Sequence, residues 1–531
     1  MQHHTYKPNS KPRKHNCSCC EFSKLSTKGL SRRNFLGGLA VVSAISGLKL
    51  AAMAETSGIS KKSPSSGIAL PPGKTLRVKP VLSYTIERRQ EKTSWRGYGG
   101  VQTQAIAEEE AGIIKTELKK LVSQAEFPIE VLPVSLVDND QKADAVSGED
   151  FDVLLLYAAG GNQVYKLAST NKPTIMFVRH KSGYHYLWYE IAHWRFLRKN
   201  EDIIKETNMD VDDIVVDDYN EILWRLRALY GLKNAKGTKM LAIGGMAAYS
   251  KPGQELGPKH AKEFWNYDFE IISEQDFTKL LAKARADENV MKQAHRQTEE
   301  LLAQPNVTLK TDRRFVVNSF LALNVCKQLM EESGATNFGF ANCMGRSVIE
   351  MLDTPPCLIL SLANDEGYTA YCHTDLTHTL PGVLLRWITS KPIFVCNSHY
   401  PNRGIFTVAH CSAPRKMNGS DYEPTTIMTH FESDYGAATK VRYTKGQVVT
   451  VIIPNLRCSK WQGFRGKILD SPSNPACRSQ IDIKIQGDFR KLLTDMQGFH
   501  VQICYGDYLR EVGYALKKIG TIEWQNFSEN V

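Results

Sequence analysis

Short, almost wholly apolar runs recur along this chain and alternate with segments of helical periodicity. A strand that lacks polar alternate positions is buried on both faces, and a parallel sheet covered by helices on both sides provides that burial. The pattern therefore predicts an α/β fold. Strands are expected at 77–84, 129–134, 152–157, 174–178 and 214–216, with helices at 105–123 and 221–232.

A second unit of the same kind is expected to begin at residue 239. The apolar run 239–243 ends in Gly244-Gly245, as 152–157 leads into Gly160-Gly161. Neither glycine pair extends into a phosphate-loop motif, so both are interpreted as turns at strand ends. The further strands expected here are 269–272, 337–342 and 357–362, and the helical stretches are 275–302 and 315–332.

The pattern changes after Pro392, where short β-rich runs are separated by Gly, Pro and Asn. Such spacing is typical of an antiparallel sheet or a small barrel. The expected strands are 394–396, 404–409, 441–443, 448–453 and 481–485, before a closing helix at 507–519. The chain is thus predicted to hold two Rossmann-like parallel-sheet domains, 74–236 and 237–368, followed by a C-terminal domain, 369–531, that contains an antiparallel β-barrel.

The amino-terminal region resembles an export signal. Arg32 and Arg33 directly precede an apolar run, 35–48, that is short for a membrane span, and Ala52-Met53-Ala54 fits a cleavage site. The pattern predicts a twin-arginine signal over residues 1–54, with an ordinary signal or a short anchor as the alternative. A Ser/Gly/Pro-rich linker follows at 55–73. The expected destination is periplasmic or extracellular, and the translocase is the expected partner.

Charge and cysteine content narrow the function classes. Of the formal net charge of +11, +8 lies in residues 1–54, so the remainder is nearly neutral and gives no argument for nucleic-acid binding. Three of the 12 cysteines fall in the leader and nine lie from Cys326 onward. An odd number leaves at least one unpaired. A disulfide framework is possible after export, but buried free thiols are expected.

The densest polar cluster follows the expected strand 357–362. Alternation in an extended segment places His373 and Asp375 on one side, where they could ligate a divalent metal with a third residue. His410-Cys411 and His500 each follow or begin a β-rich run. The cluster and these additions comprise Asp365, Glu366, Cys372, His373, Asp375, His378, His410, Cys411 and His500.

Several short motifs occur in order along the chain. They are Ser94-Trp95-Arg96-Gly97-Tyr98-Gly99-Gly100, Cys343-Met344-Gly345, Cys357, Cys372-His373-Thr374-Asp375, Val408-Ala409-His410-Cys411, Gly498-Phe499-His500 and Tyr505-Gly506-Asp507. Their order resembles that of the L-fucose/L-arabinose isomerase superfamily, in particular its fucose-isomerase-like branch. The resemblance covers nearly all of the chain from about Leu76.

The resemblance implies metal-dependent aldose–ketose isomerisation in carbohydrate metabolism, through an enediol and with manganese as the expected metal. Asp375 matches a residue used for metal binding and proton transfer, and His500 matches a metal ligand. His373 stands where the family has Glu, and Arg346 stands where it has a carboxylate. An arginine neither ligates a cation nor takes up a proton at neutral pH. Glu350 or Glu366 is therefore considered as the proton carrier.

Three hypotheses follow. The first is an isomerase with His373, Asp375 and His500 on the metal, and with Arg346, Trp95 and His410 as substrate-binding residues. The second is an exported, non-catalytic carbohydrate-binding protein on the same scaffold. The third is a different enzyme class, such as a hydrolase or an oxidoreductase. The aromatic stretch 184–194 is interpreted as a buried helix or a subunit interface, and a homo-oligomer is expected.

Overall fold

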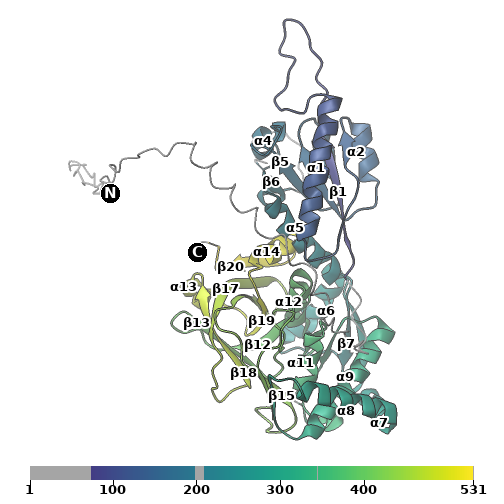
Figure 1. Ribbon diagram of the computed structural model, residues 1–531. Helices are drawn as coiled ribbons and strands as arrows, with labels where there is room; N and C mark the ends of the chain where they lie inside the picture. Colours follow the sequence, from purple (N-terminus) through teal and green to yellow (C-terminus); the bar gives the residue numbers. More distant parts are fainter. Residues whose placement is uncertain (1–72, 198–208, 344, 530–531) are drawn as a thin grey trace, which may run out of the picture. The chain divides into compact units, whose positions relative to one another are not determined.

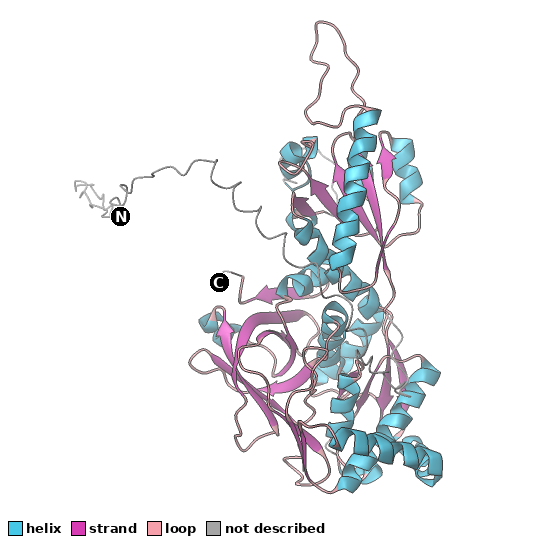
Figure 2. Ribbon diagram, in the orientation of Figure 1, coloured by secondary structure: helices cyan, strands magenta, loops and turns pink. Residues whose placement is uncertain are grey.

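The computed structural model describes residues 73–197, 209–343 and 345–529. The predicted signal at 1–54, with Arg32 and Arg33, and almost all of the predicted linker lie outside these ranges. Within them, no helix combines the length and the apolar character needed to cross a membrane. The fold is a mixed α/β fold with two parallel sheets and a closed antiparallel barrel in the C-terminal region, which confirms the predicted class (Figures 1 and 2).

The first parallel sheet has the order β2-β1-β4-β5-β6, with β3 also paired to β1. Its central strand β4 is buried at every position, as its unbroken apolar sequence predicts. Helix α1 crosses one face of the sheet (Figure 1) and begins where the Thr103 side chain accepts a hydrogen bond from the Ile106 amide. The strands are β1 (Leu76–Ser83), β2 (Ile129–Val131), β3 (Ser135–Val137), β4 (Val153–Ala158), β5 (Thr174–Val178) and β6 (Ile214–Val216).

The helices of this first unit are α1 (Gln104–Gln124), α2 (Asp140–Ser147), α3 (Gln163–Ala168), α4 (Leu187–Ala192) and α5 (Tyr219–Ala235), with a π-helix at His193–Leu197 and a 3-10 turn at Val211–Asp213. Only part of the aromatic stretch is internal, since Tyr189 and His193 are exposed. Tyr186 and Trp188 are buried, and the Trp188 ring stacks on Phe196 with 4.8 Å between centroids.

The second parallel sheet has the order β11-β10-β7-β8. Its strands are β7 (Lys239–Ile243), β8 (Asp268–Ile272), β10 (Asn337–Phe340) and β11 (Thr369–Tyr371). Its helices are α6 (Lys251–Trp265), α7 (Glu274–Ala286), α8 (Glu288–Leu302), α9 (Arg313–Ser333), α10 (Arg346–Leu352), α11 (Cys357–Asp365) and α12 (Leu376–Thr389). The expected helical stretch 275–302 is thus two helices, because Asp287 ends α7 and caps α8.

The expected strand at 357–362 is wrong: this run forms helix α11. All nine residues of α11 are buried, so the helix has no polar face and its sequence shows no helical periodicity. A short apolar run bounded by proline or glycine is compatible with a buried helix as well as with a strand. Here Pro356 directly precedes the first helical residue. The strand comes later, as β11, which pairs with β10 and extends the sheet past the predicted boundary at 368.

The barrel consists of six antiparallel strands, and pairing of β16 with both β19 and β17 closes it. Figure 2 shows the strands curving round on themselves. Apolar side chains such as Phe394, Phe406, Phe464 and Ile503 fill the interior. The strands are β12 (Phe394–Ser398), β13 (Ile405–His410), β16 (Val448–Pro454), β17 (Lys460–Asp470), β18 (Ser479–Gln486) and β19 (His500–Tyr505), and β20 (Glu523–Asn526) adds to β17 in parallel.

Three further strands form a small sheet of order β15-β14-β9, made of β9 (Val307–Lys310), β14 (Thr425–Met428) and β15 (Ala438–Val441). The expected strand at 441–443 therefore overlaps β15 only at residue 441, which is the last residue of β15. Helix α13 spans Phe489–Asp495, and α14 spans Leu509–Ile519. Helices α5, α12 and α14 share one hydrophobic core with the first sheet.

Candidate functional site: a histidine cluster beside the second sheet

The candidate site lies at the carboxyl edge of the second sheet, where ligands of open α/β sheets bind. Strand β11 ends at Tyr371 and leads directly to His373 and Asp375. Strand β7 ends at Ile243, and the loop after it carries Tyr249. Thr374 fastens the two loops together, because its Oγ1 accepts from the Ala247 amide at 2.9 Å and donates to the Gly245 carbonyl at 3.0 Å.

The barrel brings His500 to this edge. His500 is the first residue of β19, which pairs with β12 and β16. The same strand is tied to α12, since Gln502 Nε2 donates to the His378 carbonyl at 2.5 Å. His500 therefore faces residues that lie more than a hundred positions earlier in the chain.

Three imidazoles meet here, and we call His373, His378 and His500 the histidine cluster. Their ring centroids are 5.5 Å apart for His373 and His378, 4.8 Å for His373 and His500, and 4.6 Å for His378 and His500. The three side chains are almost inaccessible to solvent, at 4%, 0% and 1% exposure. Buried polar groups normally have hydrogen-bond partners, so this grouping calls for an explanation.

Five ring nitrogens of the cluster have no partner within the described structure: both of His373, both of His378 and Nδ1 of His500. His378 Nε2 lies 3.5 Å from Asp375 Oδ2, which is too long for an effective hydrogen bond. Burial lowers the pKa of His373 and of His378 to about 3, and burial together with the neighbouring imidazoles lowers the pKa of His500 as well. The rings are therefore neutral near pH 7, and the contact with Asp375 is not an ion pair.

Asp375 is completely buried and its oxygens are already in use. Oδ1 accepts from the Thr377 amide at 2.9 Å and from the Thr377 hydroxyl at 2.7 Å, so Asp375 caps α12. Oδ2 accepts from the Tyr249 amide at 3.0 Å. Both carboxylate oxygens are thus committed to the cap of α12 and to the Tyr249 loop.

Two aromatic rings lie over the cluster. The Tyr249 centroid is 4.5 Å from that of His500 and 5.2 Å from that of His373, and Phe499 lies 4.1 Å from His500. Tyr249 is 55% exposed and Phe499 is 40% exposed. The site thus has an accessible aromatic rim above buried, neutral nitrogens.

His410 adds a fourth imidazole nearby, through sulfur. Its Nε2 lies 3.4 Å from Cys372 Sγ, and Cys372 is the residue before His373. Its Nδ1 pairs with Ser412 Oγ at 2.9 Å. His410 is therefore held beside the cluster and, unlike the three cluster rings, both of its nitrogens have neighbours.

Four predicted site residues lie elsewhere. Arg346 is 90% exposed on α10 and pairs with Glu350 one turn away, at 2.5 Å. Glu366 pairs with Lys327 of α9. Since Glu366 precedes β11 and His373 follows it, the two are at opposite ends of that strand. Trp95 lies in the loop before α1, under the Arg96 guanidinium. The structure thus joins His373, Asp375, His500 and His410, and leaves these four apart.

The expected manganese does not fit these residues as they stand. Within the described ranges, no group of three or more His, Cys, Asp or Glu side chains is arranged to hold a metal ion. The nearby donors are imidazoles, whereas Mn²⁺ favours carboxylates and other oxygen ligands. The one carboxylate in place, Asp375, already serves α12 and the Tyr249 loop.

Sequence reasoning missed three parts of the site. His378 was noted in the polar cluster but given no role, although it lies one helical turn from Asp375. Tyr249 could have been found from Gly244-Gly245, because φ values of +83° and +100° turn the chain at the strand end and open the loop that presents it. Phe499 was quoted only as a neighbour of His500.

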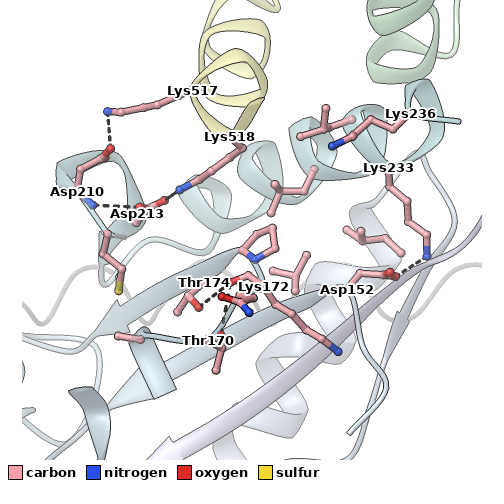
Figure 3. Close-up of a pocket in the computed structure, with 18 residues that line it drawn as sticks. Asp152, Thr170, Lys172, Thr174, Asp210, Asp213, Lys233, Lys236, Lys517 and Lys518 are labelled. Atoms are coloured by element: carbon pink, nitrogen blue, oxygen red, sulfur yellow. Dashed lines mark hydrogen bonds and ion pairs between the residues drawn. The ribbon is translucent and has the colours of Figure 1, made fainter. Parts of the chain in front are cut away.

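A separate cavity of about 530 Å³ lies at the first sheet, at the edge where its strands begin (Figure 3). Its lysines are mostly engaged: Lys233 pairs with Asp152 at 2.5 Å, Lys517 with Asp210 at 2.8 Å, and Lys518 with Asp213 at 2.5 Å. The pairs neutralise the basic lining and join α14 to the first unit. We therefore regard this cavity as a structural junction.

Comparison with known proteins yields no match: no protein-family model fits this chain, and no curated sequence resembles it significantly.

Proposed function

We propose that the protein binds a small sugar at the histidine cluster. The observation that carries the proposal is the combination of five unpartnered, buried imidazole nitrogens with the exposed rings of Tyr249 and Phe499. A buried polar group without a partner costs roughly 1–3 kcal/mol. A polyhydroxylated ligand supplies donors and acceptors in quantity, so binding would recover part of that cost.

The aromatic rim suits the other side of such a ligand. Sugar rings present C–H groups of slight positive charge, and the face of an aromatic ring is negative. A few directed polar groups beneath an apolar rim are the usual composition of a small-molecule site. The choice of a sugar over other polar ligands rests on the motifs that resemble the fucose-isomerase-like branch, which include His373, Asp375 and His500.

Aldose–ketose isomerisation is the second candidate. It is favoured by one observation, namely that His373, Asp375 and His500 lie together as the resemblance implies. The reaction needs a base for the C2 proton. Asp375 is the carboxylate in place, and both of its oxygens are already committed to hydrogen bonds with the Tyr249 loop and Thr377. Imidazoles with a pKa near 3 are also poor bases at neutral pH, so binding without turnover agrees better with the geometry.

A ligand panel tests the proposal. The protein is titrated with pentoses, hexoses and deoxyhexoses, with and without a chelator, while its melting temperature is recorded. A sugar present at 100 times its dissociation constant should add about 2.7 kcal/mol of stability. We expect the shift to persist with the chelator, to weaken in Tyr249→Ala and to survive in Tyr249→Phe, which keeps the ring.

The two candidates separate in the same samples. Formation of ketose from aldose only after a divalent metal is added would favour isomerisation. A stabilising sugar with no conversion favours binding. The absence of any shift in melting temperature across the panel would contradict a sugar site at the cluster. So would a shift in His500→Ala and in Tyr249→Ala as large as the shift in the unmodified protein.

A further inference from the structure

Three thiols from three separate segments of the chain lie close together, and we call Cys357, Cys411 and Cys477 the thiol triad. Cys357 is the first residue of α11, Cys411 directly follows β13, and Cys477 lies just before β18. The pairing of His410 with Ser479 brings the last two side by side. Cys357 and Cys411 belong to one buried cluster, Cys477 packs against it, and all three thiols are free.

Cys411 is placed to carry a negative charge. Its Sγ accepts from the Arg478 amide at 3.3 Å. Hydrogen bonds from the Cys357 and Cys477 thiols, followed by that of His430, hold the pKa of Cys411 well below its usual range. Donors of this kind around a sulfur characterise reactive cysteines, because the thiolate is the nucleophile.

Access differs within the triad. Cys357 and Cys411 are only 5% and 1% exposed, whereas Cys477 is half-buried. A reagent from solution therefore reaches Cys477 first. Cys477 in turn packs against the cluster that holds Cys411, so a second sulfur lies next to the accessible one.

We propose that the thiol triad is a thiol–disulfide exchange site for a small aliphatic disulfide. Cys477 loses its proton to solvent as its sulfur attacks the external S–S bond, and one half of the reagent leaves as a thiolate. That thiolate takes up a proton from solvent. Cys411 then attacks the Cys477 sulfur and releases the second half as a thiolate. Two protein sulfurs are oxidised by two electrons in all, and the external disulfide is reduced by two, to one thiol and one thiolate.

Cys357 gives the site a second stage. Its sulfur can attack the Cys411 sulfur of the first disulfide and pass its proton to the departing Cys477 sulfur, so that a Cys357–Cys411 bond forms and Cys477 returns to the thiol. The disulfide then lies between two buried sulfurs. The triad is better suited to this exchange than to holding a cation, because none of the described residues form a metal-binding group. The inference does not depend on the sugar site.

The test uses the full chain, reduced and desalted under native conditions, with oxidised glutathione as the probe. Free thiols are alkylated at intervals and mapped by mass spectrometry. Cys477 should react first, and a disulfide of Cys411 with Cys477 or Cys357 should follow. Fully buried thiols such as Cys326, whose pKa burial raises above its usual range, should stay reduced.

Two variants assign the steps, and one serves as a control. Cys411→Ser should accumulate the mixed disulfide of Cys477 with glutathione, because the resolving sulfur is gone. Cys477→Ser should slow oxidation of the triad by on the order of tenfold or more, since rate follows access and thiolate content. Cys326→Ser should behave as the unmodified protein does.

The proposal is overturned if Cys477 in the unmodified protein reacts no faster than Cys326, a result that needs no variant to fold. It is also overturned if folded Cys411→Ser, verified by circular dichroism, accumulates no mixed disulfide.

Discussion

Asp375 shows how one side chain takes a structural role in place of an expected chemical one. The resemblance assigns it to metal binding and proton transfer, and the structure places it among the expected histidines. Its carboxylate, however, accepts three hydrogen bonds and fixes both the start of α12 and the Tyr249 loop. We therefore expect substitution of Asp375 to lower the stability of the protein.

Asp375→Asn should lower the free energy of unfolding by about 1–3 kcal/mol, because the amide NH₂ would face the Tyr249 amide or the Thr377 donors. Urea denaturation measures the change. The matched control is Asp287→Asn, which alters an exposed cap that accepts from Asn289 at 2.8 Å and Val290 at 3.2 Å. Asn also caps helices well, so the control should be unchanged within error. An equally stable Asp375→Asn would show that the carboxylate is not needed as a cap.

The histidine cluster should make stability depend on pH. The pKa of His373 and of His378 is about 3 in the folded protein, against 6.5 for an ordinary histidine. The unfolded chain therefore binds more protons below pH 6.5. The contribution is complete above that pH and is lost as the pH falls toward 3, by roughly 1.4 kcal/mol per pH unit for each proton.

Urea midpoints at pH 7.5 and pH 5 measure this dependence. Replacing one of the two rings, in His378→Gln, should make the loss of stability between the two pH values smaller. The same loss in the variant and in the unmodified protein would mean that His378 is not buried in its neutral form. Comparing the two proteins cancels the carboxylates that titrate in the same range.

At the scale of elements, α11 is anchored by an ion pair between Asp365 and Arg415. From the sequence, Asp365 was one member of the polar cluster. Asp365, the last residue of α11, accepts from the Arg415 amide at 2.6 Å and from Arg415 Nε at 2.7 Å. Both side chains are 3% exposed. Burial raises the pKa of Asp365, although Arg415 opposes that shift. Asp365 is thus a structural residue that connects α11 to the segment after β13.

Arg415→Met should destabilise the protein by about 3–5 kcal/mol, because it leaves the Asp365 charge buried and without its cation. Thermal and urea unfolding check the loss. Arg346→Met removes the guanidinium of an exposed pair and should change neither midpoint measurably. Similar midpoints for the two variants would show that the Arg415 pair is no more important than the surface pair.

At the scale of the whole molecule, the architecture could be read from the sequence wherever the pattern of burial left a trace. Strands such as β4 and β5 are buried throughout and almost wholly apolar, and the β-rich runs after Pro392 are punctuated by turn residues. Helix α11 could not be distinguished from a strand, because burial on every side erases its period. The closeness of His373 and His500 depends on how strand β19 of the barrel is positioned against the carboxyl edge of the second sheet. Only the resemblance, and no local pattern, pointed to it.

The hydrophobic core that α14 shares with α5 is a property of the whole chain. Leu516 of α14 is completely buried in the core of the first sheet. Leu516→Ala should cost about 2–5 kcal/mol and speed amide hydrogen exchange in α5. Leu492→Ala, at an equally buried position in the barrel core, should instead speed exchange in the barrel strands. Equal protection of α5 in the two variants would contradict the dependence of the first unit on α14.

The position of α14 also has a consequence during synthesis. Arg510 of this helix pairs with Glu221 of α5, 289 residues earlier in the chain. At roughly 5–20 residues per second, the ribosome needs on the order of tens of seconds to make the intervening segment. Throughout that time the side of α5 that packs against α14 stays uncovered. A copy halted before Leu509 would keep this side open, and chaperones or proteases could tell it from a copy in which the helix has docked.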